Sequence, residues 1–353
     1  MIPTSTTDIE AIGDPTEFLS GKLMVDRDML MLFADGNAFL VELLKLFYRP
    51  ACRLVSAGLM TPEVQIAADR ADLTPVEVIS ESPFLGNTAE VLKAAGSTHD
   101  IIYVANPNRL TGMSFSLGDL EKMSRAVPDG LIIIDEYYVD HTRITALPLL
   151  DLFSNVVILR SFASSGGLKC SDAGYAITGP ERCRLLKTAA PTPGIPTTLR
   201  KSILAALIHD QELTRDLREI HDESLHMATE LNRLGLQSRI CATDWLLMRV
   251  QDTKAAGNFL ARHGVRVENL DGYPGLSHYI RYRIRPHLNN DPLIEAFKKM
   301  PPAFYRMKSL DLRAQALRLA RHDADEEMGR LRFRDTAKET PGAGKSREIA
   351  KRN

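Results

Sequence analysis

Apolar positions along the chain fall into short continuous runs that alternate with segments of helical spacing. The runs in DMLMLF, DIIYVAN, LIIID and NVVILR are rich in Ile, Val and Leu. Strands buried on both faces have this composition, whereas the segment AFLVELLKLFY carries apolar residues at the three- and four-residue spacing of a helix. The alternation predicts an α/β fold with a mostly parallel sheet that helices cover on both faces.

The pattern changes near Pro191, where a Pro-rich connection precedes one long helical pattern from about Leu199 to Leu234. Beyond it, TDWLLMRV, VRVENL and YIRYRI have the composition of strands, and DPLIEAFKKM has that of a closing helix. We therefore expect five parts: an N-terminal arm, 1–25; a large domain, 26–195; a connecting helix, 196–235; a small α/β domain, 236–301; and a helical, then disordered, basic tail, 302–353.

Composition excludes several classes of protein. The 44 Lys and Arg residues balance 45 Asp and Glu residues, so the net charge of −1 gives no reason to expect nucleic-acid binding. The 4 cysteines are far apart, which argues against a disulfide framework and against a metal site. No apolar run is long enough for a membrane span, and the polar N-terminus lacks a secretory signal. We expect a cytoplasmic protein without metal.

Polar and glycine-containing clusters directly follow three predicted strands. Asp35-Gly36-Asn37 precedes a helix, where backbone amides can bind an anion, although this cluster alone also fits an ordinary strand–helix turn. Residues 106–112 follow IIYVA, and residues 135–138 follow LIII. Ligands of open α/β sheets bind beyond the carboxyl ends of the strands, so these clusters predict one site.

Further residues give this predicted site its chemistry. Asp135 closes a buried strand and can hold a cationic ring nitrogen, and Tyr138 can donate to a ring oxygen. The hydroxyls and glycines from residue 161 to residue 175 suit a phosphate. Arg281, in the strand YIRYRI, suits bidentate capture of a carboxylate, and Arg283 either faces solvent or competes for that role.

In this order and spacing, the clusters resemble motifs of the fold-type-I, PLP-dependent aminotransferases of class I/II. The nearest members are histidinol-phosphate aminotransferase and threonine-phosphate decarboxylase. NPNRLTG is similar to the family's NPNNPTG, and DEYY is similar to its DEAY. The segment SFASSGGLKCSDAGY is similar to the segment that begins with TFSK. The resemblance covers about Met24 to Met300.

The resemblance implies a large domain with a mostly parallel seven-stranded sheet, a small C-terminal α/β domain and amino-group transfer with PLP. It also implies a small amino or carboxylate ligand and a homodimer. It assigns the substrate carboxylate to Arg281. It assigns cofactor contacts to Gly36, Asn37, Arg109, Asp135, Tyr138 and Ser161.

The sequence departs from the family where the chemistry lies. An ungapped placement puts Ser164 at the position of the lysine that forms the Schiff base with PLP, and serine cannot form an imine. The nearest lysine, Lys169, lies five residues on. Asp172 replaces an Arg that binds the cofactor phosphate, and Arg109 replaces an Asn that contacts the ring oxygen. Each change weakens cofactor binding.

These departures predict an aminotransferase-family protein without ordinary transaminase activity, so we leave its status as an enzyme open. The alternative is a PLP-dependent aminotransferase or decarboxylase that acts on an amino acid or an amino-acid phosphate. It would work without a lysine or through a shifted one, such as Lys169. In a third hypothesis, Arg109 and Arg281 bind the carboxylates of a different anionic ligand. We favour instead an internal ion pair of Arg109 with Asp172 or Asp135.

Overall fold

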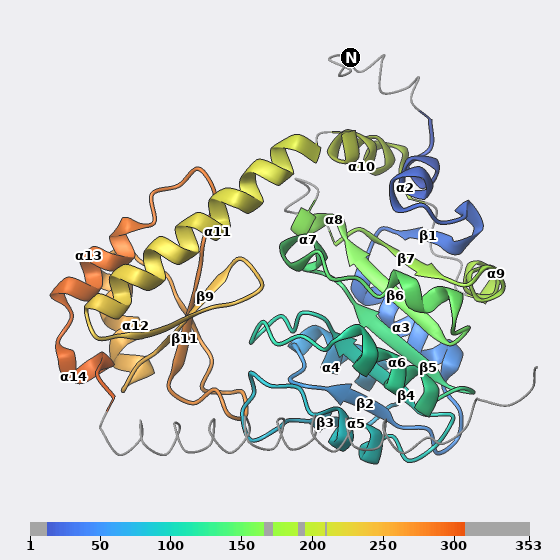
Figure 1. The fold of residues 1–353 in the computed structure, drawn as a ribbon, viewed down its shortest axis with the longest axis horizontal. Helices are drawn as coiled ribbons and strands as arrows, with labels where there is room; N and C mark the ends of the chain where they lie inside the picture. The colour runs from blue at the N-terminus through green and yellow to red at the C-terminus, as the bar shows by residue number, and fades with distance from the viewer. Residues whose placement is uncertain (1–12, 166–171, 190–194, 209, 308–353) are drawn as a thin grey trace, which may run out of the picture. The chain divides into compact units, whose positions relative to one another are not determined.

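The computed structural model of the protein describes residues 13–165, 172–189, 195–208 and 210–307 (Figure 1). The side chains of residues 164, 165, 210 and 211 also lie outside the described part. Contacts divide the chain after Arg306, and the first unit, 1–306, contains every helix and strand given below.

Seven strands form one sheet in the order β1-β7-β6-β5-β4-β2-β3 (Figure 1). Strands β2 to β6 pair in parallel, whereas β7 runs antiparallel to both of its neighbours, β1 and β6. Every residue of β4 and β5 is buried, as their unbroken apolar runs predict. The mostly parallel seven-stranded sheet is thus confirmed. The strands are β1 (Leu30–Phe33), β2 (Leu54–Ala57), β3 (Pro75–Val78), β4 (Ile101–Ala105), β5 (Leu131–Asp135), β6 (Val156–Ser161) and β7 (Gly174–Thr178).

Helices cover both faces of this sheet, and each face has its own hydrophobic core. Ile133 of β5 packs in the core that α3, α4 and α9 share, while its neighbours Ile132 and Ile134 pack in the core with α5, α6 and α10. Among the described residues, no helix combines the length and apolarity needed to cross a membrane. The helices are α2 (Pro15–Leu23), η1 (Arg27–Met29), α3 (Gly36–Phe47), α4 (Pro62–Arg70), α5 (Thr88–Ala94), α6 (Leu117–Ala126), α7 (Val139–Thr142), η2 (Leu147–Asp151), α8 (Phe162–Ser165), α9 (Pro180–Ala189) and α10 (Thr197–Ile208).

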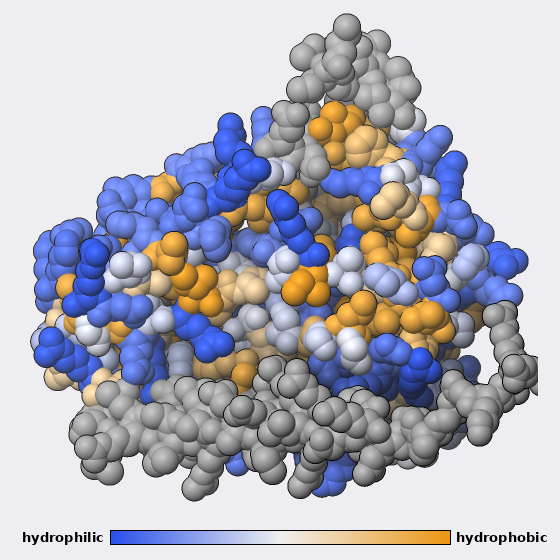
Figure 2. All heavy atoms as spheres, in the orientation of Figure 1, coloured by the Kyte–Doolittle hydropathy of each residue, from blue (hydrophilic) through white to orange (hydrophobic). Residues whose placement is uncertain are grey.

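A second, four-stranded antiparallel sheet has the order β10-β11-β9-β8. The long helix α11 buries Met227 and Leu231 against it, while the outward surface along α11 in Figure 2 is mostly hydrophilic. We call the first sheet with its helices the large domain, and this sheet with α11 to α14 the small domain. The elements are α11 (Asp210–Arg233), β8 (Gln237–Ile240), β9 (Trp245–Arg249), α12 (Thr253–Arg262), β10 (Glu268–Asn269), β11 (Tyr279–Arg283), α13 (Asp291–Lys299) and α14 (Pro302–Tyr305).

The structure differs from the sequence pattern in several places. Residues 15–23, expected in a loosely held arm, form α2, in which Asp14 accepts from the Thr16 amide and Pro15 begins the helix. The single helical pattern predicted from Leu199 to Leu234 corresponds to α10 and α11. The predicted strand VRVENL is reduced to the two residues of β10, and β8 was not predicted. Most of the predicted tail lies outside the described residues.

Candidate functional site

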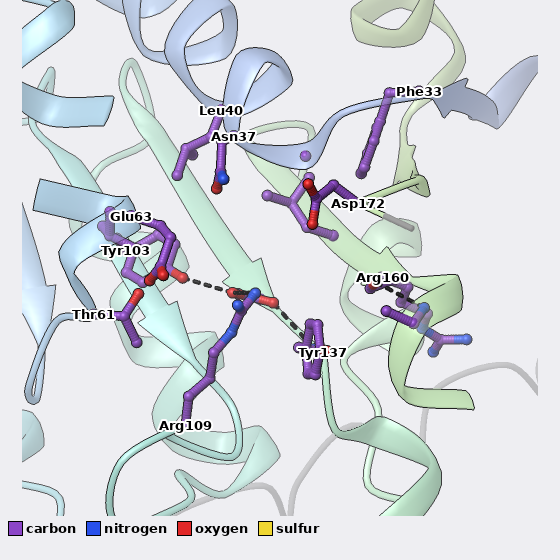
Figure 3. A pocket seen from close by; sticks show the side chains of 16 residues that line it. Phe33, Asn37, Leu40, Thr61, Glu63, Tyr103, Arg109, Tyr137, Arg160 and Asp172 are labelled. Atoms are coloured by element: carbon purple, nitrogen blue, oxygen red, sulfur yellow. Dashed lines mark hydrogen bonds and ion pairs between the residues drawn. The ribbon is translucent and has the colours of Figure 1, made fainter. Parts of the chain in front are cut away.

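A cavity of about 210 Å³ lies at the carboxyl ends of β5 and β6, beside the start of α3 (Figure 3). Five residues that the sequence assigned to a cofactor line it: Gly36, Asn37, Arg109, Asp135 and Ser161. The remaining lining residues are Phe33, Leu40, Thr61, Glu63, Val64, Tyr103, Tyr137, Leu159, Arg160, Ala163 and Asp172.

Both carboxylate oxygens of Asp135 accept hydrogen bonds from the chain itself. Oδ2 accepts from the Tyr103 hydroxyl at 2.6 Å, a bond that the dashed line at Tyr103 marks in Figure 3, and from Nη2 of Arg109 at 2.8 Å. Oδ1 accepts from the backbone N–H of Tyr137 at 3.0 Å. The predicted internal ion pair of Arg109 with Asp135 is therefore confirmed.

Arg109 is held as a cation beside Asp135. Burial alone would lower the pKa of its guanidinium, but Asp135 and neighbouring tyrosines outweigh burial and raise that pKa above its ordinary value. The Cζ atom of Arg109 also lies 4.1 Å from the centroid of the Tyr137 ring, a cation–π contact. Burial, and then the charge of Asp135, raise the pKa of Tyr103, which therefore donates as a neutral phenol. Among the described residues, Arg109 Nε and Thr61 Oγ1 are buried without a hydrogen-bond partner.

The backbone amides at the start of α3 also donate to groups of the chain. Asp35 Oδ1 accepts from the amides of Asn37 at 2.8 Å and Ala38 at 3.0 Å, as an N-cap carboxylate does. The Gly36 amide donates to the backbone carbonyl of Asp172 at 2.9 Å. The amides of the predicted anion site therefore already donate to acceptors within the chain. The Asp172 side chain also lines the cavity, which places an acid beside that site.

Ser161 ends β6 at the same cavity. Its hydroxyl accepts from the Ala163 amide at 3.0 Å and donates to the Ala173 carbonyl at 3.4 Å. The chain then enters α8, which contains the backbone of Ser164. The side chain of Ser164 and all of Lys169 lie outside the described residues, so the roles assigned to them stay predictions.

Tyr138 is directed away from the cavity. Its hydroxyl donates to Asp244 Oδ1 at 3.0 Å and accepts from Nε1 of Trp245 at 3.1 Å. The preceding residue, Tyr137, lines the cavity instead. Tyr137 and Tyr138 are adjacent in this turn but point to different sides. The Tyr138 hydroxyl is bonded to the carboxylate of Asp244 in the small domain. The ring-oxygen contact assigned to Tyr138 stays a prediction, and in this structure the hydroxyl is bonded to Asp244 and Trp245.

Arg281 is likewise used within the chain. Nε and Nη2 both lie close to Oε2 of Glu268, at 2.9 Å and 2.8 Å, and Nη1 donates to the Arg109 carbonyl at 2.8 Å. The Trp245 ring covers the guanidinium, with 4.1 Å between its centroid and Cζ. Glu268 thus holds the position predicted for a ligand carboxylate. Arg283 bonds to Asp244 at 2.7 Å rather than competing for that role.

Sequence reasoning missed Tyr103, Tyr137 and Glu268. Tyr103 lies inside a uniformly apolar strand, where a lone hydroxyl gives little signal of a partner. Glu268 is directly opposite Arg281 in the β10–β11 register, and that pairing requires the strands to be known. Within the described ranges, no group of His, Cys, Asp and Glu is arranged to hold a metal ion.

Comparison with known proteins agrees with this architecture. A sequence model of the family described as aminotransferase class I and II matches residues 11–289. A histidinol-phosphate aminotransferase of Chlorobaculum tepidum is 30% identical over 207 residues, which cover 57% of this chain and 58% of that protein. One from Chlorobaculum parvum is 28% identical over 247 residues, 67% of this chain and 68% of that protein. The chain matches a little over half the length of the first of these relatives.

Solved structures share the fold at low sequence identity. Histidinol-phosphate aminotransferase from Sinorhizobium meliloti, in complex with pyridoxal-5′-phosphate, aligns with a TM-score of 0.72 and 19% identity, covering 82% of this chain and 83% of its own. L-threonine-O-3-phosphate decarboxylase from Porphyromonas gingivalis aligns with a TM-score of 0.67 and 19% identity, covering 81% and 87%. The sheet order, the site at the strand ends and the match over residues 11–289 lead to one conclusion: the chain belongs to the class I and II aminotransferase family.

Proposed function

We propose that the chain is an aminotransferase-family protein that does not transfer amino groups through a lysine-linked PLP. The ion pair between Arg109 and Asp135, at 2.8 Å, carries this proposal. By resemblance, Asp135 would hold the ring nitrogen of the cofactor. A pair of unit charges at ~4 Å and an effective dielectric of ~20 contributes roughly 4 kcal/mol. A ring N–H would therefore have to displace a guanidinium that is already bound.

The phosphate side of the cavity supports the same proposal. The first amides of α3 donate to Asp35 and Asp172, which leaves the helix N-terminus with internal acceptors. The carboxylate of Asp172 would repel a phosphate dianion where the family has an Arg. The residues described around the cavity therefore do not fit PLP held in the family's manner, and we derive no reaction step through it.

The alternative is a PLP-dependent aminotransferase or decarboxylase with a shifted lysine. A cavity of about 210 Å³ persists at the expected strand ends, and relatives carry the names histidinol-phosphate aminotransferase and L-threonine-O-3-phosphate decarboxylase. In this alternative, Lys169 would form the Schiff base in place of the residue at position 164. A homodimer, a cytoplasmic location and a small amino or carboxylate ligand also stay predictions.

Titration with PLP tests the proposal. The purified full chain is titrated with PLP, the visible absorbance is followed, and the sample is reduced with borohydride before any modified lysine is mapped. We expect no saturable visible band and no single modified lysine. A saturable adduct at one lysine, Lys169 included, would contradict the proposal, and an assay with histidinol phosphate as amino donor would follow.

Matched variants identify which residues exclude the cofactor. Ser164→Lys alone should still fail to bind PLP, because Arg109 and Asp172 remain in the cavity. The triple variant Ser164→Lys, Arg109→Asn and Asp172→Arg should gain a saturable visible band. If Ser164→Lys alone gains that band, the Arg109–Asp135 pair does not exclude PLP.

A further inference from the structure

We infer that Arg109 braces the two domains against each other: its side chain is bound to the large domain, its carbonyl is bound to the small domain, and the contact needs no ligand. The inference rests on the proposed function in one respect, since it takes Arg109 rather than a cofactor to be the resident partner of Asp135. Four observations lead to it.

The loop that carries Arg109 is fixed by its own hydrogen bonds. Asn108 Oδ1 accepts from the amides of Leu110 at 3.0 Å and Thr111 at 3.2 Å, and Asn108 Nδ2 donates to the Leu59 carbonyl at 2.7 Å. The Gly112 amide donates to the Asn108 carbonyl at 2.8 Å. Asn108 itself is 2% exposed. These bonds set the direction of the Arg109 carbonyl, and the bond from the Arg109 side chain to Asp135 ties that part of the loop to β5.

The large-domain end of the brace is the guanidinium. Nη2 donates to Asp135 at 2.8 Å, and the Tyr137 ring covers the guanidinium with 4.1 Å from Cζ to the ring centroid. Asp135 is in turn held by the Tyr103 hydroxyl and by a backbone amide. Groups on two adjacent strands, β4 and β5, thus hold this end.

The small-domain end is Arg281, whose Nη1 donates to the Arg109 carbonyl at 2.8 Å. Arg281 is buried at 9% exposure, paired with Glu268 on β10 and stacked on Trp245 of β9. The guanidinium is therefore held from both neighbouring strands of the small sheet. One residue of the large domain and one residue of the small domain form a continuous chain of contacts from β5 to β11.

A second contact runs beside the first and meets it at Trp245. The Tyr138 hydroxyl donates to Asp244, and Trp245 Nε1 donates to the same hydroxyl. Arg283 donates to the other oxygen of Asp244 at 2.7 Å. Because Trp245 contacts Arg281 as well, loss of the Arg109 contact should loosen both of these polar contacts, which lie beside an apolar cluster that also joins the domains through Leu110 and Leu247.

Hydrogen exchange in the full chain, followed by mass spectrometry, tests the brace. Arg109→Asn keeps the backbone carbonyl that Arg281 binds but removes the side-chain bond to Asp135. Exchange should therefore rise about tenfold at the turn after β5 and, through the loosened loop, at the amides of β9; tenfold corresponds to about 1.4 kcal/mol. Arg281→Gln should have the reciprocal effect on the loop 106–112. The matched control is Arg125→Asn: Arg125 pairs with Glu121 at 2.7 Å and lies over the Phe153 ring, all within the large domain, and this change should leave β9 unaltered.

The outcomes separate the brace from the proposed function. Faster exchange confined to the large domain in Arg109→Asn would overturn the brace, and so would an unchanged loop 106–112 in Arg281→Gln. If Arg109→Asn does not fold, Arg109→Lys is measured in the same way. Lysine keeps the positive charge but lacks the planar guanidinium that lies over the Tyr137 ring. PLP titration of the unmodified chain is a separate measurement. Binding of PLP would contradict the proposed function, whereas the hydrogen-exchange rates test whether Arg109 braces the domains.

Discussion

Two acids next to each other at the end of β5 each pair with an arginine, but their surroundings differ. Glu136 accepts from Arg160 at 2.8 Å and from the Ala146 amide at 2.5 Å, and the side chains of Glu136 and Arg160 are 0% and 8% exposed. Asp135 faces the cavity, and its partner Arg109 is 30% exposed. We call the first pair the enclosed pair, because both side chains are almost fully buried, although Arg160 also borders the cavity. The second pair, the cleft pair, lines the cavity at the place where the resemblance puts a cofactor. The two pairs make the same kind of contact, and they differ in how deeply they are buried and in where they lie.

The largest expected effect comes from the enclosed pair. Glu136→Gln leaves the Arg160 guanidinium buried without its counter-charge, which should lower the free energy of unfolding by roughly 3–5 kcal/mol. Urea unfolding of the variant and of the unmodified chain measures this difference. A loss below about 1 kcal/mol would mean that the hydrogen bonds of Arg160, not its charge partner, hold this region.

The cleft pair should matter less for stability. Asp135→Asn keeps an acceptor for Tyr103, and Arg109 is exposed enough for water to hydrate it, so we expect a loss of only about 1–2 kcal/mol. The same urea experiment applies, with Glu136→Gln as the reference. Equal losses for the two variants would remove the contrast between the pairs.

The smallest effect concerns His141 on α7, whose ring packs edge-on against Tyr138 with 5.3 Å between centroids. Burial, and then the charge of Arg283, lower the pKa of His141 below its ordinary value of 6.5, against the opposing charges of Asp244 and Asp140. The unfolded chain therefore binds this proton more readily, so stability is full above pH 6.5 and is lost as the pH falls through 6.5 towards the folded pKa. The contribution of His141 to the free energy of unfolding changes by at most about 1.4 kcal/mol per pH unit.

Unfolding measured between pH 7.5 and pH 5.5 tests the sign of this dependence. His141→Phe should flatten the slope relative to the unmodified chain, since phenylalanine keeps the ring contact but does not titrate. A steeper slope in the variant would show that His141 is a stabilising cation in the folded state.

The sequence predicted the sheet and the edge at which the site lies, because buried strands leave unbroken apolar runs and their ends leave polar clusters. It also indicated that Arg109 would meet an internal acid, since the ends of adjacent parallel strands converge. It could not tell which of Tyr137 and Tyr138 faces the cavity, because the geometry of one turn decides this. The pairing of Glu268 with Arg281 could not be predicted either, because it depends on the register of a two-residue strand.

Gly112, at the end of the loop that carries Arg109, has a consequence for how this cleft can diverge. Its φ is +71°, and a methyl group on its Cα would lie 2.7 Å from Cβ of Cys241 and 2.9 Å from the Ala242 nitrogen. Any side chain there would act as a wedge between the domains as well as straining the backbone. Position 109 is less restricted, because its side chain lines the cavity. Substitutions at position 109, in the cleft, should therefore be tolerated better than substitutions at Gly112, in the contact between the domains.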